Sequence, residues 1–81
     1  MKFIWPDAAR SELRAIDRET ALRILYALTE FAETGKGDLK ALAGRWEGYF
    51  RLRIGDHRVM MSIAPEGITV VRVRHRSEAY R

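Results

Sequence analysis

Arginines on two neighbouring candidate strands predict a site for an anion. In segment 49–54, apolar residues alternate with Arg51 and Arg53, which is typical of a strand with one buried face. A glycine–aspartate pair then predicts a two-residue turn, and segment 57–63 predicts the returning strand. In this register Arg53 lies directly opposite Arg58. Because like charges opposite each other across strands are destabilising, we expect an anionic group between them.

The chemistry that suits such a site is the binding and cleavage of a phosphodiester. Cleavage of RNA requires a deprotonated 2′-hydroxyl, stabilised charge on the phosphorane and a proton for the departing 5′-oxygen. Arginine meets the second requirement, and each well-placed donor is worth about 2.7–4 kcal/mol. His75 is a candidate for proton transfer because imidazole titrates near neutral pH; the alternative is a structural role at the end of a strand.

Two further side chains have an open role. Tyr80 is a candidate for stacking on an unpaired base, a contact worth about 1–3 kcal/mol. The alternative is that Tyr80 holds the end of the chain against the sheet. His57, beside the turn and next to Arg58, is expected to be structural or to contact RNA, not to be catalytic.

Metal-independent chemistry is the simpler hypothesis. The chain has no cysteine and two histidines, too few for a metal cage without several carboxylates. The acidic residues from position 38 onward are scattered over separate predicted elements, whereas a two-metal nuclease needs acids that converge. The Gly-Lys-Gly sequence at 35–37 follows a helix instead of opening one, so it does not predict a phosphate loop. We therefore expect no metal and no other cofactor.

The distribution of charge also indicates an anionic partner. Residues 1–44 hold seven basic and seven acidic residues, whereas residues 45–81 hold eight arginines, no lysine and four acids, so the whole excess of the +4 net charge lies there. The planar guanidinium fork suits phosphate oxygens. Nucleic acid or an acidic protein is the expected partner. The alternative is a set of arginines that only solubilises the surface.

Length and composition predict one domain spanning residues 1–81. A chain of 81 residues that is 47% hydrophobic and 32% charged can build one modest core. No apolar run approaches the length of a membrane span, and the N-terminal segment is too short and too polar for a signal peptide. We expect a soluble cytoplasmic protein with no membrane partner.

The predicted fold class is α+β, with an antiparallel helical hairpin packed on one side of a four-stranded, mainly antiparallel sheet. Asp7 and Asp17 are expected to cap helices at 8–16 and from 18 to about 34, and Gly35 to end the second in a left-handed conformation. On the second helix one apolar face is expected, consisting of Ala21, Ile24, Leu25, Leu28, Phe31 and Ala32. The predicted strands are residues 2–5, 46–54, 57–64 and 68–75, with a connector at 38–45.

The last strand extends the basic face. If Val71 and Val73 are buried against the helices, Arg72 and Arg74 point to the outer face with the other arginines. Val70 conflicts with this pattern, since it shares the parity of the arginines.

Three segments, in order along the chain, resemble the RelE/ParE superfamily of bacterial toxins, and in particular its RelE and YoeB branches. They are Leu-Lys-Ala-Leu-Ala-Gly at 39–44, Tyr-Phe-Arg-Leu-Arg-Ile-Gly-Asp-His-Arg-Val at 49–59 and Val-Arg-His-Arg-Ser-Glu-Ala-Tyr-Arg at 73–81. The resemblance spans nearly the whole chain and implies the RelE-like microbial RNase fold. It implies the toxin of a type II toxin–antitoxin system, which cleaves mRNA in the ribosomal A site without metal and is restrained by a cognate antitoxin protein.

The resemblance also implies roles for individual residues. The two arginines of strand 46–54 would bind the phosphate and help to activate the 2′-hydroxyl, and Arg58 would stabilise the transition state. Arg74 or His75 would assist the leaving group, and Tyr80 would orient the substrate. The expected catalytic residues are Arg51, Arg53, Arg58, Arg74, His75 and Tyr80. The expected RNA contacts are Lys40, Arg45, Tyr49, Arg72, Arg76 and Arg81.

Departures from the family pattern leave alternatives open. Arginine stands at 51 and 53 where some active enzymes have lysine, and a guanidinium is far less able to act as a base. The family's carboxylate base has only Asp38 and Glu47 as weak candidates, so cleavage is expected to be slow or to depend on His75. The second hypothesis is a ParE-like inhibitor of DNA gyrase, and the third is a nucleic-acid-binding domain without turnover.

Overall fold

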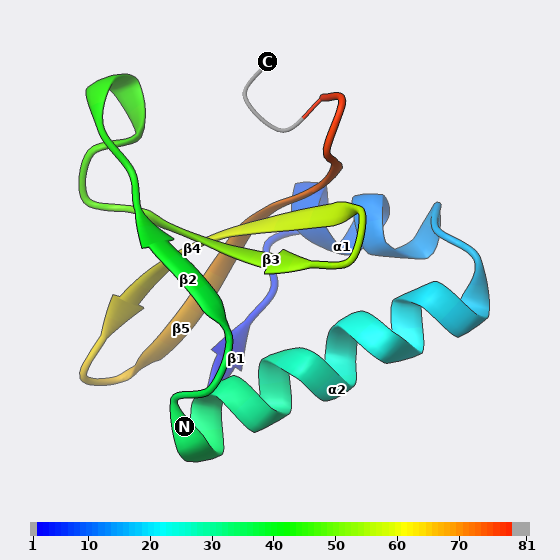
Figure 1. Cartoon of the computed structure of the whole chain (residues 1–81), viewed down its shortest axis with the longest axis horizontal. Helices are drawn as coiled ribbons and strands as arrows, with labels where there is room; N and C mark the ends of the chain where they lie inside the picture. The colour runs from blue at the N-terminus through cyan, green and yellow to red at the C-terminus, as the bar shows by residue number, and fades with distance from the viewer. Residues whose placement is uncertain (1, 79–81) are drawn as a thin grey trace.

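Five strands and two helices form an α+β fold (Figure 1). The computed structural model describes residues 2–78. Its elements in chain order are β1 (Phe3–Ile4), α1 (Asp7–Arg14), α2 (Arg18–Thr34), β2 (Asp38–Ala41), the 3-10 helix η1 (Gly44–Trp46), β3 (Phe50–Ile54), β4 (His57–Ala64) and β5 (Gly67–His75). The strand order is β1-β5-β4-β3-β2, with β1 parallel to β5 and the other neighbours antiparallel. The predicted fold class is confirmed, with one strand more than expected.

Both helices pack on the same face of the sheet. Ala9 of α1 and Ile24 and Leu28 of α2 belong to one buried cluster. The strands contribute to this cluster with Leu52, Val59, Met61, Ile68, Val70 and Val73. Within residues 2–78 neither helix covers the opposite face of the sheet, which carries the arginines. Within residues 2–78, no helix has the length and apolar character that crossing a bilayer requires.

The predicted connector at 38–45 is wrong in its first half, because this segment forms β2. The segment alternates polar and apolar residues, but over four positions only, and all four are exposed, so the pattern is too short to distinguish a strand from a connector. The predicted strand 46–54 is also too long at its start. Gly44 and Gly48 adopt positive φ values of 66° and 92° around η1, so regular pairing begins only at Phe50.

The helix ends follow the predicted chemistry with one exception. The backbone N–H of Thr20 donates to Asp17 Oδ2 at 3.0 Å, and Gly35 closes α2 with φ 76°. Asp7 is not a cap: Pro6 occupies that position, and Asp7 lies in the first turn, where its charge favours the positive end of the helix. On α2, the expected burial of Leu25 is wrong, since Leu25 is 38% exposed.

A β-bulge in β5 determines which of its valine side chains are buried. Met60 pairs with Arg72 and Met61 with Val70, so Val71 is an extra residue in β5. The side chains of Val70 and Val73 therefore both reach the core, at 0% and 3% exposure, and Val71 is only half-buried. The expected burial of Val71 is thus wrong, whereas Arg72 and Arg74 still lie on the outer face.

Gly67→Ala is expected to lower the free energy of unfolding by about 1–3 kcal/mol. A Cβ at Gly67 would lie 2.5 Å from the carbonyl oxygen of Lys2, which accepts the Ile68 N–H at 2.8 Å, so β1 would have to move. Urea unfolding measures the loss, and hydrogen exchange at the Ile68 amide should accelerate. Gly35→Ala is the control: its Cβ would meet no atom within 4 Å, so it should leave the Ile68 amide protected. Unchanged exchange at Ile68 in Gly67→Ala would contradict this account.

Candidate functional site

The basic side chains of the outer face lie in two rows that cross the sheet. In the first row Arg53 of β3 pairs with Arg58 of β4, as the sequence predicts, and Arg58 pairs with Arg74 of β5. Asp38 of β2 pairs with Arg53 and extends this row by one strand. We call Arg53, Arg58 and Arg74 the arginine row. Three guanidinium-bearing positions on adjacent strands are therefore gathered at one end of the sheet.

The second row reinforces the first. Lys40 of β2 pairs with Arg51 of β3, which pairs with Met60 of β4, which pairs with Arg72 of β5. Met60 is fully buried although it does not belong to the helix-side core, as expected if the long arginine stems cover it. The basic residues of both rows form the arginine face: Lys40, Arg51, Arg53, Arg58, Arg72 and Arg74.

Two carboxylates hold the arginines at the margins of this face. Glu12 of α1 binds Arg74 Nε at 2.7 Å and Arg72 Nη1 at 3.1 Å through one oxygen, and its other oxygen accepts the Val73 N–H at 2.8 Å. On the other margin, Asp38 Oδ1 binds Arg51 Nη2 at 3.3 Å. The Arg51 side chain is only 14% exposed, and its buried Nε has no hydrogen-bond partner among the described residues. These arginines are thus fixed in position by the protein itself.

Arg58 at the centre of the row is different. Its Nη1 donates only to the backbone carbonyl oxygens of Gly55 and His57, each at 3.2 Å, and no carboxylate among residues 2–78 pairs with it. Arg53 beside it is exposed and has no ion pair within the same residues. Two guanidinium groups on neighbouring strands therefore keep donors for an external anion, and an anion between them would relieve their mutual repulsion.

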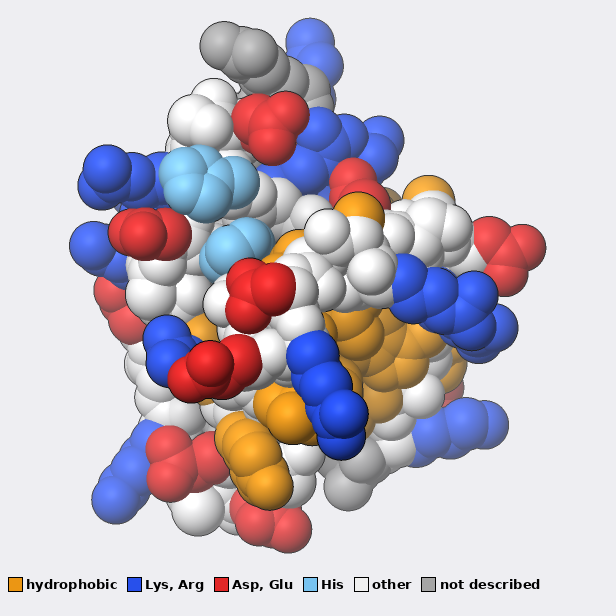
Figure 2. Space-filling model, turned by 90° about the vertical axis from the view of Figure 1, so that its right-hand side faces the viewer, with side chains coloured by type: hydrophobic (Ala, Val, Ile, Leu, Met, Phe, Trp, Pro, Cys, Tyr) orange, Lys and Arg blue, Asp and Glu red, His pale blue; other side chains and the backbone are white. Residues whose placement is uncertain are grey.

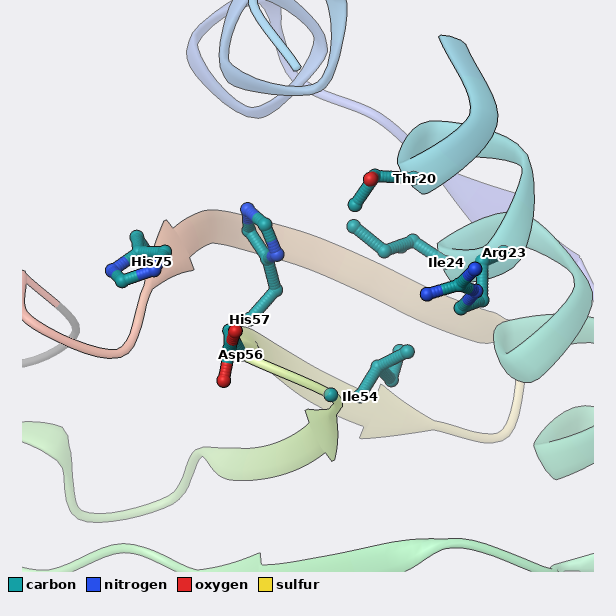
Figure 3. A pocket seen from close by; sticks show the side chains of 8 residues that line it. Thr20, Arg23, Ile24, Ile54, Asp56, His57 and His75 are labelled. Carbon is teal, nitrogen blue, oxygen red and sulfur yellow. The ribbon is translucent and has the colours of Figure 1, made fainter. Parts of the chain in front are cut away.

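The two histidines lie on the other face of the sheet. His57 pairs with His75 one position beyond the arginine row, and their rings meet edge to face with centroids 5.6 Å apart, side by side at the surface in Figure 2. Both line a pocket of about 190 Å³ between the β3–β4 turn and α2 (Figure 3). His75 is the last residue of β5 and is exposed. The arginine row and His75 are therefore adjacent along the strand but point to opposite faces.

Local hydrogen bonds set the proton position on His75. The Ser77 N–H donates to His75 Nδ1 at 3.3 Å, and the Ser77 hydroxyl lies 3.1 Å from the same nitrogen. Nδ1 is therefore an acceptor in the neutral ring, so the ring proton is assigned to Nε2.

The stability of the fold is expected to fall on acidification because of His57. Burial is the main cause that lowers the pKa of His57, and the neighbouring charge of His75 lowers the pKa further. A depressed pKa means that the unfolded chain binds the proton more readily, so stability is lost as the pH falls through the ordinary histidine pKa. Thermal unfolding from about pH 7.5 to about pH 5.5 should show a steeper fall for the wild type than for His57→Gln. Parallel curves for the two proteins would contradict this assignment.

Comparison with known proteins identifies the family. The family of ParE toxins of type II toxin–antitoxin systems, parDE, matches residues 3–80. The chain belongs to this family. It is the toxin component of a type II toxin–antitoxin system, and the RelE/ParE resemblance of the sequence is confirmed. No curated protein matches the toxin's sequence.

Solved structures of related toxins share the fold. The RelB–RelE antitoxin–toxin complex of Methanococcus jannaschii is 22% identical over 91% of each chain, with a TM-score of 0.74. The RelBE2 complex of Mycobacterium tuberculosis is 28% identical over 91% of this chain and 95% of that chain, with a TM-score of 0.64. A YafQ variant from E. coli is 10% identical over 99% and 98%, with a TM-score of 0.80.

The remaining expected RNA contacts of the toxin are more dispersed. Tyr49 precedes β3 and packs edge to face on Trp46, with ring centroids 5.7 Å apart. Arg45 lies on η1, outside the strands of the arginine face, and Arg76 follows β5 and donates its backbone N–H to the Asp56 carbonyl at 2.7 Å. Tyr80 and Arg81 lie outside the described residues.

Sequence reasoning missed Glu12, which holds two arginines of the face from a helix about 60 positions away. A single sequence carries no signal for a contact of this range. Across residues 2–78, no three histidine, aspartate or glutamate side chains converge as a metal ligand set would.

Proposed function

We propose that this toxin cleaves mRNA during translation by metal-independent transesterification. The observation that carries the proposal is the arginine row, in which Arg58 and Arg53 keep guanidinium donors for a phosphate while both margins are held by carboxylates. The structural likeness to RelE and YafQ toxins supports a place in the RelE-like branch of the superfamily rather than among gyrase inhibitors. In the reaction the 2′-oxygen bonds to phosphorus and the bond to the 5′-oxygen breaks, leaving a 2′,3′-cyclic phosphate and a 5′-hydroxyl.

In this proposal the arginine row stabilises the negative charge that develops on the pentacoordinate phosphorane. A guanidinium donates two parallel N–H bonds to phosphate oxygens, and these bonds strengthen as charge develops. Arg58 would bind the phosphate at the centre of the row and Arg53 would contact a second oxygen. Arg74 of β5, whose Nε is held by Glu12, would add positive potential beside Arg58.

Proton transfer needs one group on each side of the phosphate. Asp38 lies on β2 in register with Arg53, and Arg51 engages only its Oδ1, so Oδ2 can accept the 2′-hydroxyl proton. His75 lies at the end of β5, and its Nε2 can donate a proton to the 5′-oxygen if the RNA strand bends around that end of the sheet. Along the strand order Asp38 lies on one side of Arg58 and His75 on the other, and the His75 ring points to the helix side of the sheet. We propose these roles for them.

The partners follow from the same surface. We propose that mRNA in the ribosomal A site is the substrate, and that a cognate antitoxin restrains the toxin by laying an acidic segment across the arginine face. Antitoxins accompany the toxins in the RelB–RelE complex and the YoeB–YefM complex of Staphylococcus aureus. An antitoxin that competes with RNA for Arg53 and Arg58 would support this part of the proposal.

Mapping cut sites on a translated mRNA after induction of the toxin tests the function. We expect cuts that require translation and that carry 5′-hydroxyl ends. Intact mRNA together with inhibited DNA supercoiling would instead establish gyrase inhibition. Intact mRNA with retained RNA binding would indicate a domain without turnover.

A further inference from the structure

The outward face of α2 carries a stripe of exposed residues that the proposed RNA chemistry does not use. At 3.6 residues per turn, its members lie within about 100° of the helix surface. This α2 stripe consists of Arg18, Leu22, Leu25, Tyr26, Thr29 and Glu33, all of them exposed. Leu22 is 44% exposed and Tyr26 76%. Apolar side chains that reach the surface among charged ones are visible in Figure 2. An exposed apolar cluster with a charged residue at each end is typical of a contact surface.

The middle of the stripe has the shape of a socket. Leu22, Leu25, Tyr26 and Thr29 line a hollow of about 160 Å³. These positions are spaced i, i+3, i+4 and i+7, the four that form the hole for a knob from a facing helix. Tyr26 itself, the most exposed large hydrophobic side chain among residues 2–78, is a suitable knob.

The charges at the ends of the stripe make it self-complementary. Arg18 begins α2 and Glu33 lies one residue before its end, and neither has an ion pair within the described part of the chain. If a second α2 packs antiparallel around a twofold axis between positions 25 and 26, Arg18 meets Glu33 of the other copy. In the same arrangement Leu22 meets Thr29, and Tyr26 enters the opposite hollow beside Leu25.

From these features we propose that a second copy of this chain docks on the α2 stripe, forming an antiparallel, twofold-symmetric dimer. Arg18 lies about 11 Å along the helix from the axis, so a shallow crossing of about 20° keeps both ion pairs within reach. One helix face is smaller than the ~800 Å² per partner of a standard interface, so the dimer is weak, with a dissociation constant on the order of 10–100 μM. Because α2 covers the opposite side of the sheet, the arginine face stays open in the dimer.

Sedimentation equilibrium of the toxin purified away from its antitoxin tests the proposal. We expect a reversible monomer–dimer equilibrium that Tyr26→Glu abolishes. Arg18→Glu and Glu33→Arg should each weaken self-association at least tenfold, because each places like charges together twice. Both substitutions favour the helix dipole, so the fold should persist, as circular dichroism can verify.

Mixing the two charge variants gives the sharpest result. An equimolar mixture of Arg18→Glu and Glu33→Arg should form a heterodimer, since both ion pairs are then restored, one with its native polarity and one with its polarity reversed. A wild-type protein that remains monomeric up to about 1 mM, or a mixture that stays monomeric while the wild type dimerises, would overturn the proposal. Cleavage of mRNA should be unchanged in Tyr26→Glu, so failure of the dimer and failure of the nuclease function are distinguishable.

Discussion

We expect Arg58→Ala to lower the rate of mRNA cleavage by the toxin by about 10²–10³-fold. Arg58 is the central guanidinium of the arginine row, and its only partners among the described residues are two backbone carbonyls. Its substitution removes a charge-assisted donor pair from the position where phosphorane charge develops, without leaving a carboxylate unpaired. The measurement is the cleavage rate of a reporter mRNA in a reconstituted translation reaction.

Stability serves as the control for this variant. The unfolding midpoint of Arg58→Ala should stay near that of the wild type, because the side chain is only half-buried and its hydrogen bonds are partly solvated. Arg14→Ala, which removes an exposed arginine at the end of α1, should leave cleavage unchanged. Arg58→Lys keeps the positive charge but loses the planar guanidinium that can donate two parallel N–H bonds. We therefore expect its cleavage rate to lie between those of the wild type and Arg58→Ala. Full activity in Arg58→Ala would exclude Arg58 from the reaction.

The second large effect is expected at Glu12. Glu12→Ala should lower the free energy of unfolding by about 1–3 kcal/mol, because the N–H of the buried Val73 loses its acceptor and Arg72 and Arg74 lose their counter-charge. At the same time the affinity for RNA should rise, since Arg74 then repels Arg58 unless a phosphate binds between them. Urea unfolding and fluorescence anisotropy with a short RNA measure the two effects.

Glu12→Gln separates the two roles of this carboxylate. The amide oxygen of glutamine can still accept the Val73 N–H, so most of the stability should return, whereas the negative charge is gone and the gain in RNA affinity should remain. Equal stability of Glu12→Ala and the wild type, or weaker RNA binding by either variant, would contradict this role for Glu12.

The arginine row could be predicted because its determinants are local. Alternation of Arg51 and Arg53 with apolar residues sets the faces of β3, and Gly55 with φ 59° permits the two-residue turn that fixes the pairing of Arg53 with Arg58. The N-terminal cap of α2 and its glycine stop are equally local, since each depends on residues within one turn of the helix.

What the sequence could not supply depends on distant contacts. The exposed edge strand β2 is held by its pairing with β3, and its polar–apolar alternation covers only four residues. The bulge at Val71 and the hydrogen bond between Glu12 and the Val73 N–H of β5 likewise arise from packing between segments far apart in the chain. The placement of His75 differs, because strict alternation after Arg74 already puts it on the helix side of the sheet.

The most direct test of the arginine row is side-chain NMR of the toxin with a short RNA whose 2′-oxygens are methylated, so that it binds without being cleaved. We predict that the Nε–Hε signals of Arg53 and Arg58 shift on titration, while those of Arg14 and Arg23 on the helices do not. The shifts should diminish as salt is added, because phosphate contacts release counterions. Shifts confined to the helical arginines, with Arg53 and Arg58 unmoved at saturating RNA, would contradict the role proposed for this face.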